Sequence, residues 1–440
     1  MNESTRHSYR AAPVTAVGGA LHVPGDKSIS HRALLMGAIA EGPTRIKGFL
    51  ASADCLATLA ALRALGVTVE QLADTEVAVT GVGMSGLRAS AKALDMGNAG
   101  TAMRLFMGLL CGQNFSSLLV GDASLMRRPM ERVARPLRLM GARIDTQSDR
   151  PPVVLHASGQ LKAIDYTLPM ASAQVKSAIL LAALRARGVT HVTEPAPTRD
   201  HTERMLKSFG ATVHRQGYTV ELAGGQHLLG TTIEVPGDFS SAAFLIVAGC
   251  LAAREGLTVR RVGINPTRTG LLDMLRLMGA QISVTPLATN GCEPLADISV
   301  RASALRGTAI PPELVPLAID ELPILFIAAA CAAGETLVTG ASELRVKESD
   351  RLAVMAEGLA ALGIHCELLA DGIRIHGGTL RGGRVESHGD HRVAMAFAVA
   401  SVRAAAPIEI EDVANVATSF PGFSTVAGHA GLALTEVQSA

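Results

Sequence analysis

The chain repeats itself, and this repeat limits its possible fold more than any other feature. Residues 23–49, VPGDKSISHRALLMGAIAEGPTRIKGF, align with residues 235–262, VPGDFSSAAFLIVAGCLAAREGLTVRRV. Both segments contain Val-Pro-Gly-Asp, small polar residues, an Ala- and Leu-rich stretch typical of a helix, a Gly and a short β-branched strand. Looser copies give six units in all, spaced about 70 residues apart. The looser copies begin at Gly97, Pro169, Ile319 and His388.

A second helix is predicted inside most units. Its copies carry apolar residues at i, i+3 and i+4, end at a Gly, and are followed by an alternating strand. They begin at Ala57, Ala134, Thr202, Leu271 and Ala353. Each unit is therefore predicted to be βαβαββ. The sixth is expected to be truncated and to end in a weaker copy near Ser424–Leu434.

The best-matched copies are the first and the fourth, which predicts an α/β protein with two similar domains of three units each. We expect residues 24–234 to form one domain and residues 1–23 with 235–440 to form the other, with the active site in the cleft between them. The strand before Pro24 is expected to pair with the second half, so that the chain crosses twice. A solenoid is the alternative, and it is less favoured because the unit is long and the halves match each other best.

Composition excludes several classes of function. The 440 residues carry a formal net charge of +1, so no global field attracts nucleic acid or an acidic membrane. The absence of Trp and the presence of only three Tyr argue against base stacking. The six Cys show no C-x-x-C pair, and the longest apolar run, Pro323–Ala333, is far below the 18–20 residues, roughly, that span a bilayer. We expect a soluble cytoplasmic protein with neither nucleic-acid nor membrane partners.

The starts of the Ala-rich helices are candidate anion sites. Each start places capping or small residues where free N–H groups and the positive end of the helix dipole attract anions. Any one start is better explained as an ordinary cap with a basic side chain lying along the surface. As a set between two halves they would suit a small, multiply charged anion. The accompanying cations are Lys27, Arg32, Arg104, Lys176 and Arg392.

Three loops add further charge. One carries Arg127 and Arg128, one carries Arg199, and ELRVKESDRL concentrates charge around position 348. On a helix, Lys347 and Arg351 would lie one turn apart on one face with Glu348 beside them, although a solvated charged face is the usual explanation of such a run. Asp320 begins an apolar helix, either as a simple N-cap or as a positioned base.

No motif indicates a metal or a cofactor. Residues 81–86 match G-x-G-x-x-G, but no acidic residue follows where a ribose would need it, and a turn joining two strands is favoured. His388, Asp390 and His391 lack partners at ligand spacing, which favours helix capping with anion contact over a metal site.

Nine motifs between about Leu21 and Phe423 resemble those of the 5-enolpyruvylshikimate-3-phosphate (EPSP) synthase family. They are PGDKSISHR, GNAGTAMR, GDASLMRRP, PMASAQVKS, TRDHTE, NPTRTG, RVKESDR, GDHR and ATSFPGF, in family order. The resemblance implies two domains of three βαβαββ units, an inside-out α/β barrel. It also implies a monomer that needs no cofactor and transfers the enolpyruvyl group of phosphoenolpyruvate to the 5-hydroxyl of shikimate 3-phosphate, a step toward chorismate and the aromatic amino acids.

The resemblance also assigns roles by motif. Asp320 is implied as the base on the 5-hydroxyl, Glu348 as the proton donor, and Lys27 as a catalytic group that contacts both substrates. The residues implied to bind shikimate 3-phosphate are Lys27, Ser28, Arg32, Ser172, Ala173, Gln174, Arg199, Asp320 and Lys347. Those implied to bind phosphoenolpyruvate are Lys27, Gly100, Arg128, Gln174, Arg351 and Arg392.

The sequence departs from the family pattern at two of these motifs. Thr418 stands where many members have Lys, and Ala173 where many have a second Ser. These two departures, with the motifs SAQVKS and TRDHTE, resemble the subgroup that tolerates the inhibitor glyphosate. Gly100 instead matches sensitive members, so we expect sensitivity.

Two rival functions are open from the sequence. UDP-N-acetylglucosamine enolpyruvyl transferases have a reactive Cys in the loop that corresponds to Asp122–Arg128, and this chain has none there. A non-catalytic anion-binding paralogue would lack the acid and base groups, and both Asp320 and Glu348 are present.

Overall fold

The computed structural model describes residues 6–289 and 291–439, which divide into two compact units. The N-terminal unit holds Gly25–Val235 and a short segment that ends at Glu293; the C-terminal unit holds the chain up to Pro24, Pro236–Thr289 and the chain from Pro294 onward. The change-overs differ by one residue from those expected from the sequence. The segment ending at Glu293 was expected in the other domain. It groups with the N-terminal unit because the buried Glu293 carboxylate lies 2.6 Å from His201 Nδ1.

The N-terminal unit contains three four-stranded sheets, each with one parallel pair extended by two antiparallel strands. Their strands are β3 (Glu41–Lys47), β4 (Thr68–Ala73), β5 (Glu76–Val82), β6 (Leu94–Asp95), β7 (Ser117–Val120), β8 (Ile144–Gln147), β9 (Arg150–Leu155), β10 (Asp165–Thr167), β11 (Val189–Thr193), β12 (Val213–Gln216), β13 (Thr219–Ala223) and β14 (Thr232–Glu234). The sheet orders are β14-β3-β5-β4, β6-β7-β9-β8 and β10-β11-β13-β12. The helices are α1 (Lys27–Ile39), α2 (Ala53–Ala64), α3 (Gly100–Leu110), the 3₁₀ helix η1 (Leu125–Arg127), α4 (Glu131–Leu139), α5 (Ala173–Ala183) and α6 (His201–Ser208).

The C-terminal unit repeats this plan, except that one of its three sheets has three strands. Its strands are β1 (Arg6–Ala12), β2 (Gly19–His22), β15 (Leu257–Gly263), β16 (Gln281–Leu287), β17 (Leu295–Arg301), β18 (Glu335–Val338), β19 (Cys366–Leu368), β20 (Ile373–His376), β21 (Gly383–Glu386), β22 (Ile408–Glu411) and β23 (Ala433–Ser439). The sheet orders are β16-β17-β15-β2, β18-β20-β19 and β21-β22-β1-β23. Its helices are α7 (Phe239–Ala252), α8 (Gly270–Leu277), η2 (Pro312–Leu317), α9 (Leu322–Ala330), η3 (Ser342–Val346), α10 (Arg351–Ala361), α11 (His391–Ala400), η4 (Ser401–Arg403), η5 (Ala414–Thr418) and α12 (Phe423–His429).

Two strands are exchanged between repeats. β2 precedes α1 in the chain but pairs in parallel with β15 of the C-terminal unit, as the sequence predicted. β14 precedes α7 but pairs in parallel with β3 of the N-terminal unit. The sixth repeat is not truncated, contrary to the sequence-based prediction, because β1 from the start of the chain lies between β22 and β23 and completes its sheet.

Three of the inner helices, α1, α7 and α11, begin at an Asp that caps them. The Asp26 side chain accepts a hydrogen bond from the Ile29 N–H at 2.9 Å at the start of α1. Asp238 accepts from Ser240 and Ser241 at the start of α7, and Asp390 accepts from the Arg392 N–H at 2.9 Å at the start of α11. Each bond satisfies a backbone donor that the first turn of a helix leaves free.

The outer helices end at glycines in the left-handed region. α2, for example, ends at the C-cap Leu65, and the next residue, Gly66, has φ +87°. A residue with a Cβ is strained in this conformation, which turns the chain from the helix into the next strand. The other outer helices named in the repeat end in the same way, at Gly141, Gly210, Gly279 and Gly363.

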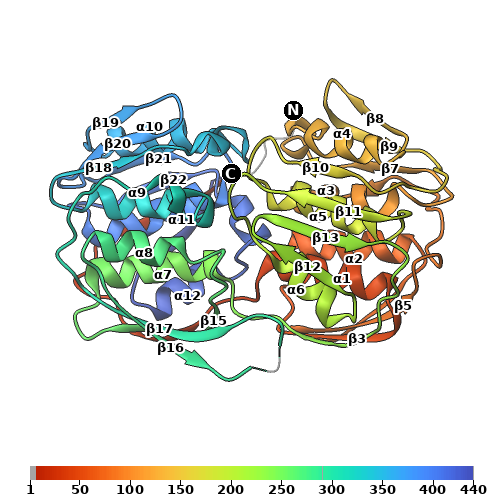
Figure 1. The fold of residues 1–440 in the computed structure, drawn as a ribbon. Helices are drawn as coiled ribbons and strands as arrows, with labels where there is room; N and C mark the ends of the chain where they lie inside the picture. The colour runs from red at the N-terminus through yellow and green to blue at the C-terminus, as the bar shows by residue number, and fades with distance from the viewer. Residues whose placement is uncertain (1–5, 290, 440) are drawn as a thin grey trace. The chain divides into compact units, whose positions relative to one another are not determined.

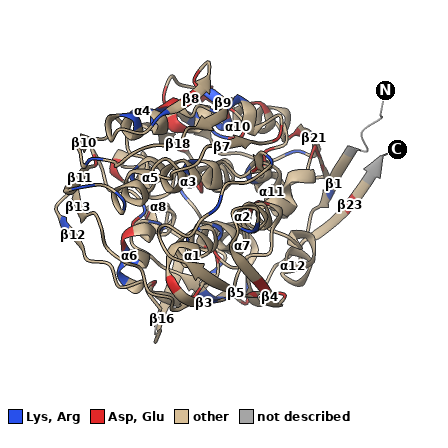
Figure 2. Ribbon diagram, turned by 90° about the vertical axis from the view of Figure 1, so that its right-hand side faces the viewer, with Lys and Arg blue, Asp and Glu red and all other residues tan. Residues whose placement is uncertain are grey.

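Each unit buries its own hydrophobic core around three inner helices. In α1, α3 and α5, and in α7, α9 and α11, nearly every side chain is buried, which is the pattern of a helix enclosed on all sides. Figure 1 shows these helices side by side within each unit, with the strands on the outside. In the view of Figure 2 the inner helices are mostly tan, and basic and acidic residues are interspersed over strands and loops.

Candidate active site

The start of α1 carries the first group of predicted site residues. The Asp26 cap makes Lys27 the first helical residue, and Lys27 Nζ lies 3.0 Å from Asp54 Oδ2. The ammonium is partly exposed, with 18% of its side chain accessible. The Asp54 carboxylate therefore holds Lys27 at the start of α1, where solvent or a ligand can reach the ammonium.

Arg32 lies one turn further along α1 and is almost fully buried. Its Nη1 donates to the Ser28 carbonyl at 2.9 Å, and its other two nitrogens donate to hydroxyls of α5 and α6. Burial lowers the pKa of Arg32 to about 10, and the nearby positive charge of Arg199 acts in the same direction.

The start of α3 gathers a second cationic group. Arg104 Nη1 donates to Gln174 Oε1 at 2.6 Å, and Gln174 Nε2 donates to Thr101 at 2.8 Å, which ties α3 to α5. Arg128 Nη2 donates to Asn98 Oδ1 at 2.5 Å. A Cβ added at Gly100 would lie 2.9 Å from Arg128 Nη1 and 3.3 Å from Arg104 Nη1, so both guanidinium groups border this glycine.

α5 differs from its prediction in two respects. Ser172 stands at the N-cap, but its side chain makes no capping hydrogen bond. Lys176, which the sequence grouped with the cations at the helix starts, is fully buried, and its Nζ lies 2.9 Å from Glu194 and 2.7 Å from Glu203. Lys176 therefore joins α5 to the carboxylates of its neighbours and is unavailable to an anion at the helix start.

In the C-terminal unit the predicted site residues meet at Asp320. Lys347 Nζ and Arg351 Nη1 each lie 3.4 Å from Asp320 Oδ1. Arg392 Nη1 donates to the backbone carbonyl of Asp320 at 3.0 Å. Glu348 Oε2 accepts from Arg351 Nη2 at 2.6 Å, so all five predicted residues of this unit form one network.

Arg351 is fully buried among carboxylates. Its Nε lies 2.8 Å from Asp390 Oδ2 and its Nη2 lies 3.2 Å from Asp390 Oδ1. Burial opposes the charged form, but the charges of Asp390, Glu348 and Asp320 outweigh it and raise the pKa of Arg351. Asp390 thus caps α11 and also orients Arg351, a second contact that sequence reasoning missed because 39 residues separate the pair.

The sequence-based prediction for Lys347, Glu348 and Arg351 was wrong about the helix. α10 begins at Arg351 because the Asp350 side chain caps it by accepting from the Ala353 N–H at 3.1 Å. Lys347 and Glu348 lie before the helix, at and after the end of η3. Asp320 is likewise not the N-cap of α9, because Glu321 occupies that position. The Asp320 carboxylate instead forms ion pairs with Lys347 and Arg351.

The two units therefore offer different chemistry. The N-terminal unit presents cations, amides and helix starts that suit phosphate and carboxylate groups. The C-terminal unit presents carboxylates held by cations, groups able to accept or give a proton. Among the described residues, no three or more His, Cys, Asp or Glu side chains are arranged to hold a metal ion. No helix in residues 6–289 or 291–439 is long and apolar enough to cross a membrane.

The family is decided by comparison with known proteins. The family model described as EPSP synthase (3-phosphoshikimate 1-carboxyvinyltransferase) matches residues 11–426. The 3-phosphoshikimate 1-carboxyvinyltransferase of Alkalilimnicola ehrlichii is 59% identical over 429 residues, which cover 97% of this chain and 96% of that protein. The chain belongs to the EPSP synthase family.

Solved structures agree with this EPSP synthase assignment. The EPSP synthase from Acinetobacter baumannii is 52% identical, has a TM-score of 0.88 and covers 98% of this chain and 100% of its own. The enolpyruvyl transferase NikO from Streptomyces tendae is 18% identical with a TM-score of 0.82 and covers 99% of this chain and 100% of its own; it shares the fold alone. The two domains of three βαβαββ units, an inside-out α/β barrel, are therefore confirmed. The curated relative named above acts on 3-phosphoshikimate by its name, which favours this function over the UDP-N-acetylglucosamine rival.

At position 418, Thr stands where many family members have Lys, and its side chain forms a hydrogen bond within the same turn. Thr418 ends η5, and its hydroxyl donates to the Asn415 carbonyl at 2.7 Å. The Asn415 side chain donates in turn to the Gly389 carbonyl at 2.9 Å, next to the start of α11. Position 418 therefore supplies no positive charge to this part of the EPSP synthase fold.

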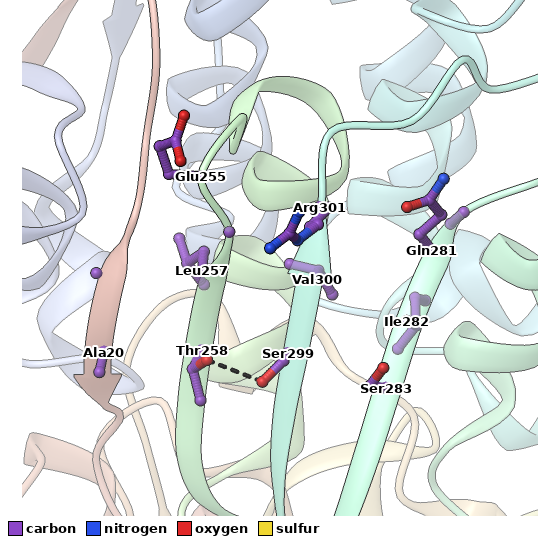
Figure 3. Close-up of a pocket in the computed structure, with 13 residues that line it drawn as sticks. Ala20, Glu255, Leu257, Thr258, Gln281, Ile282, Ser283, Ser299, Val300 and Arg301 are labelled. Atoms are coloured by element: carbon purple, nitrogen blue, oxygen red, sulfur yellow. Dashed lines mark hydrogen bonds between the residues drawn. The ribbon is translucent and has the colours of Figure 1, made fainter.

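A separate pocket lies against the sheet β16-β17-β15-β2 and has a volume of about 780 Å³ (Figure 3). Among the described residues, Glu255 and Arg301 are the charged residues that line it, and Thr258 Oγ1 and Ser299 Oγ, also in its lining, lie 2.8 Å apart. None of the predicted site residues lines it. The pocket is therefore not the candidate active site.

Proposed function

We propose that this chain transfers the enolpyruvyl group of phosphoenolpyruvate to the 5-hydroxyl of shikimate 3-phosphate and releases phosphate. The observation that carries the proposal is the Asp320 network, which places a carboxylate beside Lys347 and Arg351 and a second carboxylate, Glu348, on the same arginine. A general base and a general acid are the groups that the reaction requires. Their presence also argues against a non-catalytic paralogue.

The reaction balances as an addition followed by an elimination. In the addition, the 5-oxygen bonds to C2 of phosphoenolpyruvate, its proton leaves to Asp320, and Glu348 protonates the C3 methylene. The product is a tetrahedral intermediate that still carries the phosphate. In the elimination, the Glu348 carboxylate takes a proton from the C3 methyl and the bond from C2 to the phosphate oxygen breaks, which restores the double bond. The phosphate leaves with the proton that Asp320 had accepted.

We assign binding roles from the motifs and from the charges described above. Arg128, Arg351 and Arg392 bind phosphoenolpyruvate together with Lys27, Gly100 and Gln174, because guanidinium forks match carboxylate and phosphate oxygens. Shikimate 3-phosphate is bound by Lys27, Ser28, Arg32, Ser172, Ala173, Gln174, Arg199, Asp320 and Lys347. We infer that the reaction is carried out by a monomer in the cytoplasm.

Phosphate release tests the function directly. The purified protein should release phosphate only when both substrates are present, and mass spectrometry should show a product equal to shikimate 3-phosphate plus the enolpyruvyl group. Omission of either substrate is the control. Phosphate release that requires UDP-N-acetylglucosamine in place of shikimate 3-phosphate would contradict the proposal, as would no release at all.

The Gly100→Ala substitution should weaken phosphoenolpyruvate binding and inhibition by glyphosate. The added Cβ would lie 2.9 Å from Arg128 Nη1, so the guanidinium must move by a fraction of an ångström. A shift of this size in a binding group raises the KM for phosphoenolpyruvate by about 10- to 100-fold. The same methyl group would crowd the inhibitor and raise its half-inhibitory concentration. Steady-state kinetics with and without glyphosate measure both effects.

Gly428→Ala is the matched control for this substitution. Gly428 lies in α12, and a Cβ there would have no heavy atom within 4 Å. Its kinetics should match those of the unmodified protein. A Gly100→Ala variant with the same KM and the same inhibition as Gly428→Ala would show that Gly100 does not border the phosphoenolpyruvate site.

A further inference from the structure

Arg32 is held by neutral groups on all three of its nitrogens. Its Nε donates to Thr202 Oγ1 at 2.7 Å, its Nη2 to Ser177 Oγ at 2.9 Å and its Nη1 to the Ser28 carbonyl at 2.9 Å. Thr202 and Ser177 are fully buried, so water does not compete for these bonds. A guanidinium has five N–H donors, and these three bonds leave one on each terminal nitrogen for another acceptor.

The two hydroxyls form a directed chain. Each hydroxyl has one hydrogen, so a hydroxyl that accepts from Arg32 must give its own hydrogen elsewhere. Thr202 Oγ1 donates to Ser177 Oγ at 2.7 Å, and Ser177 Oγ donates to the Ala173 carbonyl at 2.6 Å. The chain therefore runs from Arg32 on α1 through α6 to Ala173, the first residue of α5 and one of the predicted binding residues.

Arg351 shows the contrasting arrangement. Its guanidinium contacts the carboxylates of Asp390, Glu348 and Asp320, which compensate its charge. Beside Arg32, the carboxylate next along α6 is Glu203, and Glu203 is paired with Lys176 at 2.7 Å. Glu203, Asp26 and Glu293 act on Arg32 through their charges, but the hydrogen bonds that fix its direction go to neutral groups.

We propose that Thr202 and Ser177 are positioning residues that aim the Arg32 guanidinium at an anionic group of shikimate 3-phosphate. This inference rests on the proposed function for the identity of the ligand. The positioning acts on shikimate 3-phosphate and leaves phosphoenolpyruvate, whose proposed site lies around Arg128, unaffected. The substrate that a Thr202 or Ser177 variant binds more weakly therefore shows which binding group these hydroxyls position.

Four variants distinguish the effect of losing a hydroxyl group from the effect of changing the packing around it. Thr202→Val keeps the shape but removes the hydroxyl, and Ser177→Ala removes the second one. Each should raise the KM for shikimate 3-phosphate by about tenfold or more, the scale of a lost hydrogen bond to a charged group, with the KM for phosphoenolpyruvate unchanged. Thr202→Ser keeps the hydroxyl, so its KM for shikimate 3-phosphate should equal that of the unmodified protein. Thr190→Val is the matched control, because Thr190 is fully buried in the same unit and its Oγ1 makes no hydrogen bond to the described residues.

A second measurement reports on Arg32 without any substrate. In protein with ¹⁵N-labelled arginine, the Nε–H signal of Arg32, assigned with Arg32→Lys, should exchange slowly with solvent. Exchange should become fast in Thr202→Val and remain slow in Thr190→Val and Thr202→Ser.

The two readouts distinguish the possible failures. Equal kinetics and equal exchange in Thr202→Val and Thr190→Val would overturn the positioning role. A KM for shikimate 3-phosphate that is as high in Thr202→Ser as in Thr202→Val would also overturn it. Slow exchange that depends on Thr202, in a protein that does not turn over shikimate 3-phosphate, would retain the hydroxyl chain but overturn the proposed function and the ligand named here.

Discussion

Replacement of Asp320 by Asn is expected to lower kcat by about 10²- to 10⁴-fold, the range that a general base contributes. The amide keeps the size of the side chain and can still accept a hydrogen bond from Lys347 or Arg351, each 3.4 Å from Oδ1. It cannot take the proton of the 5-hydroxyl. Glu348→Gln should lower kcat in the same range because the amide cannot protonate the methylene carbon. Phosphate release at saturating concentrations of both substrates measures the two effects.

Glu343→Gln is the matched control for both substitutions. Glu343 is another carboxylate of the same cluster, 3.1 Å from Lys347 Nζ, and no proton transfer is assigned to it. Its removal should change kcat by less than about tenfold, the effect of an altered ion pair. Full activity in Asp320→Asn or Glu348→Gln would contradict the role of that residue. A loss in Glu343→Gln as large as in Asp320→Asn would mean that the charge of the cluster matters and not the transfer of a proton.

Replacement of Lys176 by Met should lower the free energy of unfolding by about 3–5 kcal/mol, the cost of removing one partner from a buried ion pair. Lys176 lies 2.9 Å from Glu194 and 2.7 Å from Glu203, and neither the lysine nor Glu194 has an exposed side chain. Without the ammonium, the two buried carboxylates lose their closest cation. Urea titrations of the variant and the unmodified protein measure the difference.

Arg276→Met provides the comparison for this prediction. Arg276 Nη1 lies 3.1 Å from Asp273 Oδ1, and both side chains are about half exposed, so the pair contributes less than about 1 kcal/mol. A Lys176→Met variant as stable as Arg276→Met, with a raised KM for shikimate 3-phosphate, would instead make Lys176 a binding residue. That was the role suggested by its position near a helix start.

Much of the fold could be predicted because its signals are local. Asp26 and Gly66 act within a few residues of their own helix ends, and the repeat of such signals predicts the order of helices and strands. The place of β1 could not be predicted in this way. β1 lies between β22 and β23, and this pairing joins the two ends of the chain through backbone hydrogen bonds that leave no motif in the sequence.

The site shows the same division between local and distant contacts. Motifs identified Arg32 and Arg351 as binding residues, but their partners lie far along the chain: Thr202 is 170 residues from Arg32, and Asp390 is 39 residues from Arg351. The direction of Lys176 was also missed, since a helix start with a nearby cation has the same sequence whether the side chain turns inward or outward. Packing against Glu194 and Glu203 decides that direction.

The central claim is that Asp320 and Glu348 carry out the proton transfers on shikimate 3-phosphate and phosphoenolpyruvate. A crystal structure of the protein with shikimate 3-phosphate and phosphoenolpyruvate tests it most directly, with the slow variant Asp320→Asn used to preserve both substrates. The account predicts one shikimate 3-phosphate with its anionic groups at Arg32 and Gln174 and its 5-hydroxyl within hydrogen-bond distance of residue 320. A bound shikimate 3-phosphate whose 5-hydroxyl lies beyond hydrogen-bond distance of residue 320 would contradict it.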